Sequence, residues 1–230
     1  MCDDPNAIMM FAAGFGTRMG ALTKDRPKPL IEVAGKTLLD HSLDLAREIS
    51  PNAIVVNTHY FADQIAAHLS GTEAVLSNES PDVLETGGGL RHALPLLGRG
   101  PVFTTNTDAI WKGPNPFSML RDAWQPDEMD ALLLCIPRDH AIGHKGNGDF
   151  LIDNDNRLTR GPGVIYSGVQ ILRTERLEHI QDGAFSLNLV WTEMAKDRRL
   201  FGLSYPGKWC DVGTPDGIDL AEDMLEDRDV

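Results

Sequence analysis

The stretch that decides the fold runs from residue 7 to residue 19 and reads AIMMFAAGFGTRM. Residues 7–13 are apolar and stop at a glycine, which is typical of a buried strand. Gly14 and Gly16 let backbone N–H groups approach an anion closely, because no Cβ intervenes and unusual φ values are permitted. Arg18 adds a guanidinium fork that suits phosphate oxygens. The stretch predicts a strand followed by an anion-binding loop, although an ordinary strand-to-helix turn can contain the same glycines.

Short apolar runs alternate with segments of helical spacing in the first part of the chain. Strands are predicted at residues 53–57, 102–105 and 131–136, and helices at residues 38–49 and 117–124. Strands that alternate with helices favour an α/β fold whose sheet is mostly parallel. In such a sheet, ligands bind at the carboxyl ends of the strands.

The pattern changes after about residue 138. Residues 140–149 are rich in Gly, His and Asn, and residues 153–156 read as a polar turn between short strands. A further strand is predicted at residues 164–172, and helices at residues 187–195 and 218–225. The sequence contains no internal repeat and no low-complexity linker, so we expect one domain over residues 1–230.

The composition limits the function classes. The 230 residues carry a formal net charge of -13, which disfavours binding to nucleic acid. A protein that handles phosphates would therefore need a few well-placed cations or a metal ion. No apolar run is as long as a membrane span and the N-terminus does not resemble a signal peptide, so we expect a cytoplasmic protein with no membrane partner. Cys2, Cys135 and Cys210 have no metal-binding spacing and suit a reducing compartment, with Cys2 as a tail thiol.

Two familiar phosphate-binding motifs fit the sequence poorly. A dinucleotide-binding fingerprint needs a third glycine where Met19 stands, and an acidic residue where the second strand ends in Asn-Thr-His at residues 57–59. Residues 35–37, Gly-Lys-Thr, imitate the end of a P-loop, but the first glycine of that motif would fall at Leu30. We interpret residues 35–37 as a turn before a helix.

Lys28 has a restricted backbone because Pro27 precedes it and Pro29 follows it. Proline fixes its own φ and restricts the residue before it, so the chain here is stiff and extended. An ammonium held in this way can point at a phosphoryl group with little loss of entropy, whereas a solvated loop lysine is the ordinary alternative.

Residues 81–89, PDVLETGGG, form a second glycine-rich stretch. We expect a loop here, followed by a helix through His92 and Leu94. Three successive glycines before a helix suit close packing of a flat ring against the backbone, and a nucleobase is a natural candidate.

Two aspartates follow apolar runs. Asp108 ends the motif Asn106-Thr107-Asp108 after the strand at residues 102–105, and Asp211 begins Asp-Val-Gly-Thr after Trp209 and Cys210. A carboxylate at the carboxyl end of a buried parallel strand lies in the ligand crevice, where it can bind a hard cation. Capping or turn formation is the ordinary role of either residue alone.

Taken in order, these motifs resemble those of the sugar-1-phosphate nucleotidyltransferases. The shared pattern is A-A-G-x-G-x-R-M, then P-K-P-L, L-E-T-G-G-G, N-x-D and D-V-G-T, from about residue 8 to residue 222. The resemblance is greatest to the uridylyltransferases that act on N-acetylmuramate 1-phosphate in cell-wall recycling. It implies a Rossmann-like α/β nucleotidyltransferase fold with a mixed, mostly parallel central sheet flanked by helices. The nucleotide-binding half would span about residues 7–138, and the sugar-binding half about residues 139–230.

The resemblance also implies roles for individual residues. The nucleotide would be bound by Ala12, Ala13, Gly14, Gly16, Thr17, Arg18, Lys28, Thr86, Gly87, Gly88 and Asn106. Arg18 would hold the β- and γ-phosphates and Lys28 would neutralise the α-phosphate, and both would be catalytic together with Asp108. Asp108 and Asp211 would share Mg²⁺. The sugar would face Gly148, Asp149, Ser167 and Gly168.

The implied reaction joins a sugar 1-phosphate to a nucleoside triphosphate, with UTP favoured, and releases pyrophosphate. The attacking phosphate is already an anion, so positioning and charge neutralisation suffice and no general base is needed. Alternatives are GTP with mannose 1-phosphate, UTP or dTTP with glucose 1-phosphate, CTP with phosphocholine, and a non-catalytic nucleotide sensor. The chain ends soon after the Asp211 motif, so we expect a stand-alone transferase, a monomer or homodimer, without a hexapeptide-repeat part.

The sequence departs from the family pattern at two positions. Thr107 stands where the family usually has glycine, and Phe15 stands where a small or polar residue is common. Both departures could alter how the loops close. The roles of His59, His140 and His144 stay open at this stage.

Overall fold

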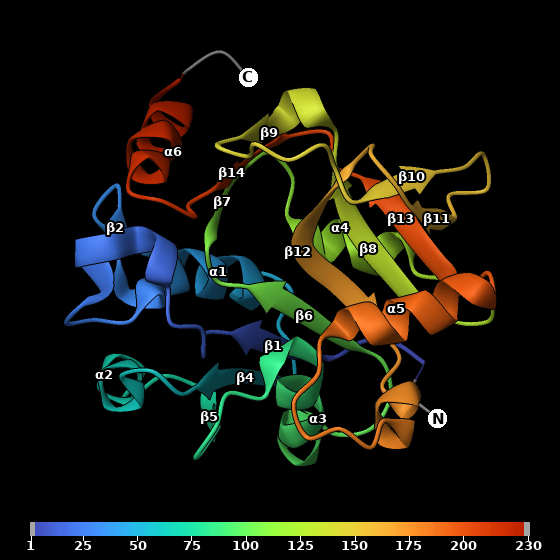
Figure 1. The fold of residues 1–230 in the computed structure, drawn as a ribbon, viewed down its shortest axis with the longest axis horizontal. Helices are drawn as coiled ribbons and strands as arrows, with labels where there is room; N and C mark the ends of the chain where they lie inside the picture. The colour runs from blue at the N-terminus through green and yellow to red at the C-terminus, as the bar shows by residue number, and fades with distance from the viewer. Residues whose placement is uncertain (1–2, 228–230) are drawn as a thin grey trace.

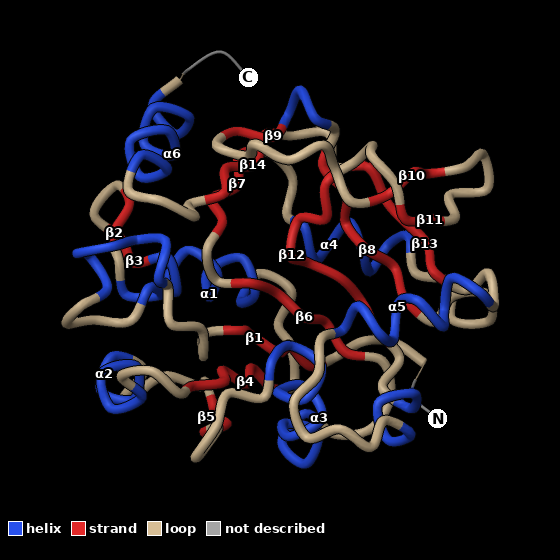
Figure 2. The backbone as a smooth tube through the Cα atoms, in the orientation of Figure 1, coloured by secondary structure: helices blue, strands red, loops and turns tan. Residues whose placement is uncertain are grey.

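The computed structural model describes residues 3–227, so Cys2 lies outside the described residues. Its centre is a seven-stranded sheet with the strand order β13-β8-β12-β6-β1-β4-β5 (Figures 1 and 2). The strands are β1 (Ala7–Phe11), β4 (Ala53–Thr58), β5 (Val75–Asn78), β6 (Val102–Asn106), β8 (Ala131–Ile136), β12 (Ile165–Leu172) and β13 (Leu200–Ser204). In this part of the chain β12 runs antiparallel to both its neighbours, and the other neighbouring strands are parallel. The predicted α/β class with a mixed, mostly parallel sheet is confirmed.

Helices cover both faces of the sheet, because the side chains of each strand alternate between two apolar layers. In β1, Ile8 and Met10 belong to one layer, and Ala7 and Met9 to the other. The first layer includes side chains of α1 (Leu38–Arg47), α2 (Ala62–His68) and α4 (Pro116–Ala123). The second layer includes side chains of α3 (Glu85–Leu97) and α5 (Leu187–Lys196).

A smaller sheet with the order β7-β14-β9 lies beside the main one, and α6 packs against it (Figure 1). Its elements are β7 (Ala109–Lys112), β9 (Ala141–Ile142), β14 (Lys208–Asp211) and α6 (Asp216–Glu226). The remaining strands form the hairpins β2 (Glu32–Val33) with β3 (Lys36–Thr37), and β10 (Phe150–Ile152) with β11 (Leu158–Arg160). Short 3-10 helices occupy Thr17–Thr23, Lys28–Leu30, Arg138–His140 and Glu175–His179.

Most elements with a clear apolar pattern are those that the sequence predicts; the buried strand β13 is an exception. The strand expected at residues 131–136 is β8 and is buried throughout, and the helix expected at residues 38–49 is α1. The structure adds β5, α2 and β13, which we did not predict. The edge strand β5 is mostly exposed and α2 buries Ile65 among polar neighbours, so neither shows a regular apolar period.

The expectation of a loop at the three glycines is wrong. Gly87, Gly88 and Gly89 lie inside the first turns of α3. The first N–H groups of a helix have no partner within it, and here the N–H groups of Gly87 and Gly88 both donate to the carbonyl of Phe185. Tertiary contacts therefore compensate for the low helix propensity of glycine.

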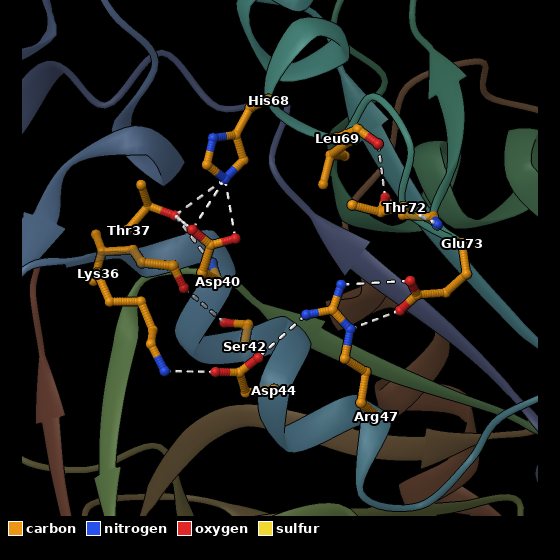
Figure 3. A network of polar contacts seen from close by, with 12 residues as sticks. Lys36, Thr37, Asp40, Ser42, Asp44, Arg47, His68, Leu69, Thr72 and Glu73 are labelled. Carbon is orange, nitrogen blue, oxygen red and sulfur yellow. Dashed lines mark hydrogen bonds and ion pairs between the residues drawn. The ribbon is translucent and has the colours of Figure 1, made fainter.

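The predicted turn before a helix is confirmed at Gly35, whereas Lys36 and Thr37 form the short strand β3 that leads into α1. Gly35 has a φ of 74° between β2 and β3, and the Thr37 hydroxyl caps α1 by accepting a hydrogen bond from the backbone N–H of Asp40. Lys36 pairs with Asp44 on α1 at 2.5 Å, so its ammonium points along this helix (Figure 3). His68 of α2 contacts Asp40 at 3.0 Å and joins α2 to the capped end of α1 (Figure 3).

Candidate active site

A cavity of about 340 Å³ opens at the carboxyl ends of β1, β4 and β6. These strands are adjacent and parallel, so the segments that follow them emerge at the same edge of the sheet. After β1 the chain continues to β4 on one side, and later returns to β6 on the other. The strand order therefore reverses at β1, which is where open α/β sheets bind their ligands.

Most residues that we expect to bind the nucleotide line this cavity. They are Ala12, Ala13, Gly14, Gly16, Thr17, Arg18, Lys28, Thr86 and Asn106. Asp108, which we expect to be catalytic and to hold Mg²⁺, lines it too. The fold thus gathers four motifs that are far apart in the sequence. Their participation in ligand binding stays a prediction, but their meeting in one cavity is a property of the structure.

Gly16 is needed where the glycine loop meets Lys28. Its φ is 62°, a left-handed conformation that side chains disfavour. A Cβ at this position would lie 2.8 Å from the Cβ of Lys28 and 3.0 Å from Cγ2 of Thr23. The loop can therefore pack directly on the stem of Lys28, which directs the lysine into the cavity.

Lys28 and Asp108 form an ion pair in the cavity. The Nζ atom of Lys28 donates to Oδ2 of Asp108 at 2.8 Å, and the two side chains are 11% and 29% exposed. The pair joins the proline-flanked segment to the end of β6. An ammonium has three N–H donors, so this contact leaves two for other acceptors.

Arg18 and Asp211 meet at Gly213. A Cβ built on Gly213 would lie 2.7 Å from a terminal nitrogen of Arg18 and 3.1 Å from Oδ1 of Asp211. The N–H of Val212 donates to the backbone carbonyl of Asp108 at 2.9 Å, which holds the Asp211 motif beside β6. Among residues 3–227 no hydrogen bond or ion pair to the Arg18 guanidinium is formed, so its N–H groups are available to donate to an anionic ligand.

The surroundings of Asp211 fit a bound cation. Burial raises the pKa of Asp211, and the negative charge of Asp108 raises it further, while Lys28, Arg18 and His144 lower it. Two neighbouring carboxylates offer oxygen ligands to a hard divalent ion. Within the described residues no cluster of three or more His, Cys, Asp or Glu side chains suits a metal. A cation held by Asp108 and Asp211 would therefore complete its coordination with oxygens that are not from the protein, as Mg²⁺ commonly does.

The opposite wall of the cavity comes from the segment before α3. Val83, Glu85 and Thr86 line the cavity. Gly87 and Gly88 do not, because they face the segment 183–185: a Cβ on Gly87 would lie 2.3 Å from the ring of Phe185. The structure therefore places the predicted base-binding glycines behind the wall.

The four residues that we expect to face the sugar lie outside the cavity. Gly168 on β12 is nearest, since a Cβ there would lie 3.0 Å from the side chain of Asn106 in the cavity wall. Ser167 is buried, and its Oγ accepts a hydrogen bond from Val169 N–H. The Oδ2 atom of Asp149 accepts from the N–H of Tyr166 at 2.9 Å, and Gly148 packs on Gly163. Of the four residues, Gly168 therefore borders the cavity, on the β6 side.

The two departures from the family pattern have local partners. The Thr107 hydroxyl is buried and donates to the carbonyl of Phe11 at 2.9 Å, which joins the ends of β6 and β1. Phe15 is 50% exposed, and its ring packs against the rings of His59 and Tyr60, each with a centroid distance of 5.6 Å.

The other two histidines whose roles were open lie near the smaller sheet. His144 lies close enough to Asp211 to lower its pKa, and its ring is 6.4 Å from that of Trp209. His140 contacts the carbonyl of Gly207 through Nδ1 at 3.0 Å.

Asn57 and Glu79 are cavity-lining residues that the sequence did not indicate. Both are buried and face the cavity, at the end of β4 and just after β5. Asn57 could have been found by the rule that found Asp108, since it also ends a buried parallel strand. Glu79 has no such signal, because β5 lacks an apolar pattern.

Comparison with known proteins identifies the family. Residues 8–179 match the MobA-like NTP transferase domain. The chain is 41% identical to the N-acetylmuramate alpha-1-phosphate uridylyltransferase of Caulobacter vibrioides, over 98% of this chain and 99% of that protein. It is 32% identical to the protein of that name from Neisseria meningitidis serogroup B, over 90% and 92% of the two chains. The fold resembles that of the inositol-1-phosphate CTP transferase from T. maritima, with a TM-score of 0.77, 17% identity and 97% of each chain covered. The chain therefore belongs to the MobA-like NTP transferases, and it is a sugar-1-phosphate nucleotidyltransferase.

Proposed function

We propose that this protein transfers the uridylyl group of UTP to N-acetylmuramate 1-phosphate, giving UDP-N-acetylmuramate and pyrophosphate. Two relatives at 41% and 32% identity carry the name of this activity, and the chain spans nearly their whole length. The proposal includes a place in cell-wall recycling in the cytoplasm, with the protein acting as a monomer or homodimer. No helix among residues 3–227 is long and apolar enough to cross a membrane.

The observation that carries the proposal is the set of charges in the cavity. Lys28 pairs with Asp108 at 2.8 Å, and the guanidinium of Arg18 lies beside Asp211. Two cations that retain unused N–H donors, in a protein of net charge -13, give an anionic ligand a local binding site.

The reaction needs positioning and charge neutralisation. An oxygen of the sugar phosphate forms a bond to the α-phosphorus of UTP while the bond from that phosphorus to the bridging oxygen breaks, and pyrophosphate leaves. Arg18 binds the β- and γ-phosphates, and the two remaining donors of Lys28 bind the α-phosphate and the incoming phosphate. Their fixed directions align the attacking and leaving oxygens.

Asp108 and Asp211 would hold Mg²⁺, which when bound neutralises negative charge on the phosphates. Asp108 also orients the ammonium of Lys28 through their ion pair, and Asp211 lies near the guanidinium of Arg18.

Pyrophosphate release from a matrix of substrate pairs tests the proposal. The matrix combines UTP, CTP, GTP and dTTP with N-acetylmuramate 1-phosphate, mannose 1-phosphate, glucose 1-phosphate and phosphocholine, and mass spectrometry identifies each product. We expect the highest kcat/KM for UTP with N-acetylmuramate 1-phosphate. A higher value for another pair would contradict the substrate assignment. Nucleotide binding without release from any pair would contradict catalysis and favour a sensor.

A further inference from the structure

Glu79 is a buried carboxylate at the wall of the cavity, and the reaction proposed above gives it no role. The residue is 1% exposed. Its Oε1 atom accepts a hydrogen bond from Nδ2 of Asn57 at 2.6 Å, and its Oε2 atom accepts from the N–H of Leu84 at 2.7 Å. Burial of a carboxylate is costly unless hydrogen bonds compensate it, so both contacts matter for the local structure.

Asn57 extends this contact to the glycine loop. Its Oδ1 atom accepts a hydrogen bond from the N–H of Ala12 at 2.6 Å. The hydrogen bonds thus form one chain from Ala12 through Asn57 and Glu79 to Leu84, which we name the Glu79 relay. Ala12 belongs to one wall of the cavity, and Leu84 lies between Val83 and Glu85 in the opposite wall. The relay therefore fixes the separation of the two walls.

The backbone of Glu79 reinforces the same connection. Its N–H donates to the carbonyl of Thr58 at 2.8 Å, and its carbonyl contacts Nδ1 of His59 at 2.8 Å. The ring of His59 packs in turn against Phe15 of the glycine loop. One residue thus joins three segments that surround the cavity.

The Glu79 relay explains why the third glycine of α3, Gly89, is needed. A Cβ at this position would lie 2.4 Å from Oε1 of Glu79 and 3.0 Å from Nδ2 of Asn57. The helix packs directly on the relay, so the glycine leaves room for it, and Gly89 is not among the residues that line the cavity.

We propose that Glu79 is a positioning residue for the nucleotide, which holds the two cavity walls at the separation that a nucleobase requires and thereby sets affinity and base selectivity. The inference rests on the proposed binding of a nucleoside triphosphate in this cavity. A flat ring between two backbone walls is sensitive to their spacing. The triphosphate lies nearer Arg18 and Lys28, which the relay does not contact.

The polarity of the relay allows a sharp test. A carboxylate only accepts, so it directs the amide nitrogen of Asn57 toward itself and the amide oxygen toward Ala12. In Glu79→Gln the new amide offers one acceptor and one donor group. If its oxygen faces Asn57, its nitrogen opposes the N–H of Leu84; if it is turned, Asn57 must also turn, and its nitrogen then opposes the N–H of Ala12. Either way, a mismatched pair of donors lies in one of the two walls.

Asp130→Asn is the matched control. Asp130 is also a buried carboxylate, and it accepts hydrogen bonds from Arg176 and Arg199 at the start of β8. It is not among the residues that line the cavity. The control therefore makes the same chemical change at a buried acceptor without touching either wall.

The test measures KM and kcat for the sugar phosphate and for the nucleotide, and compares UTP with CTP. Calorimetry measures nucleotide binding separately. We expect Glu79→Gln to raise the KM for UTP about tenfold and to narrow the preference for UTP over CTP. The KM for the sugar phosphate should stay within about twofold, as should all constants of Asp130→Asn. Gly89→Ala crowds the relay while keeping the carboxylate, so it should reproduce the nucleotide effect even where Glu79→Gln does not fold.

Two results would overturn the inference. One is an unchanged KM and base preference in folded Glu79→Gln or, where that variant does not fold, in Gly89→Ala. The other is an equal rise of both KM values in Glu79→Gln and in Asp130→Asn, as a general loss of stability would give. Wild-type protein that binds no nucleoside triphosphate would instead contradict the proposed function, and the inference with it.

Discussion

Lys28 and Lys36 are close in the sequence, and the structure gives them different surroundings. Lys28 is 11% exposed and its ammonium contacts Asp108 in the cavity, whereas Lys36 is 45% exposed and pairs with Asp44 on the surface of α1. Prolines on both sides restrict Lys28, while Lys36 lies in a hairpin next to a glycine turn. The fold therefore places Lys28, which we propose binds phosphate, in the cavity and leaves Lys36, which only resembles a P-loop lysine, on the surface.

Alanine at each position should separate the two roles. We expect Lys28→Ala to lower kcat/KM by about 100- to 1,000-fold, since a charge-neutralising donor at the reacting phosphate is lost. Lys36→Ala should leave kcat/KM unchanged, and should alter the free energy of unfolding by less than about 1 kcal/mol, because exposed ion pairs contribute little. Steady-state kinetics and urea unfolding measure the two effects. Equal losses of kcat/KM in both variants would contradict the assignment of Lys28.

The positions of Cys135 and Cys210 inside buried strands explain why these thiols should be unreactive. Cys135 lies in β8 and Cys210 in β14, and both are buried. Burial raises the pKa of both thiols, to about 12 for Cys210, and the charges of Asp149 and Asp211 raise it further at Cys135 and Cys210 respectively. The thiolate is the reactive form, so a raised pKa makes both residues inert near neutral pH.

Alkylation should show this protection. In a Cys2→Ser variant at pH 8, we expect iodoacetamide to label Cys135 and Cys210 at least about a hundredfold more slowly in the folded protein than in urea. Mass spectrometry of the intact protein counts the labels. Rapid labelling of either residue before unfolding would show that its strand is not packed as described.

The strand ends were easier to predict than the connections between them. Asp108 follows a buried apolar strand, and that pattern alone located it at the carboxyl edge of the sheet, where the structure has it. The helical position of Gly87 to Gly89 was missed, because the carbonyl of Phe185 that satisfies the N–H groups of Gly87 and Gly88 is about a hundred residues away in the chain. Local sequence cannot show a partner so distant, since tertiary contacts override helix propensity.

The candidate site also contains residues that local sequence predicts and residues that only the fold reveals. We predicted Arg18 and Lys28 as site residues from the glycines and prolines beside them in the sequence, and both line the cavity. Glu79 was missed because its significance depends on contacts with Asn57 and Leu84, and nothing in the adjacent sequence distinguishes it from a surface acid. A buried polar network depends on which side chains contact one another, and only the fold determines those contacts.

The cavity joins segments that are far apart in the chain, because its walls come from residues between 11 and 108 and from Gly213. A ligand bound there contacts several of these segments at once and should stabilise the protein against unfolding. UTP with Mg²⁺ at a hundredfold excess over its Kd should add about 2.7 kcal/mol, which raises Tm by roughly 5–10 °C in a protein of this size. Uridine lacks the phosphates that we propose Arg18 and Lys28 bind, so it should raise Tm much less. Differential scanning fluorimetry compares the two ligands, and equal shifts would contradict the proposed phosphate contacts.

The most direct test of the account is the rate of pyrophosphate release by Asp108→Ala, measured with Mg²⁺ and with the substrate pair that the wild-type protein uses best. Asp108 is the residue at which the ion pair with Lys28 and the carboxylate pair with Asp211 meet. We predict a loss of at least about a thousandfold in kcat. The variant's Tm should stay close to that of the wild type, because the side chain is 29% exposed and outside the apolar layers. A folded Asp108→Ala protein with kcat close to the wild-type value would contradict the claim that nucleotidyl transfer takes place in this cavity.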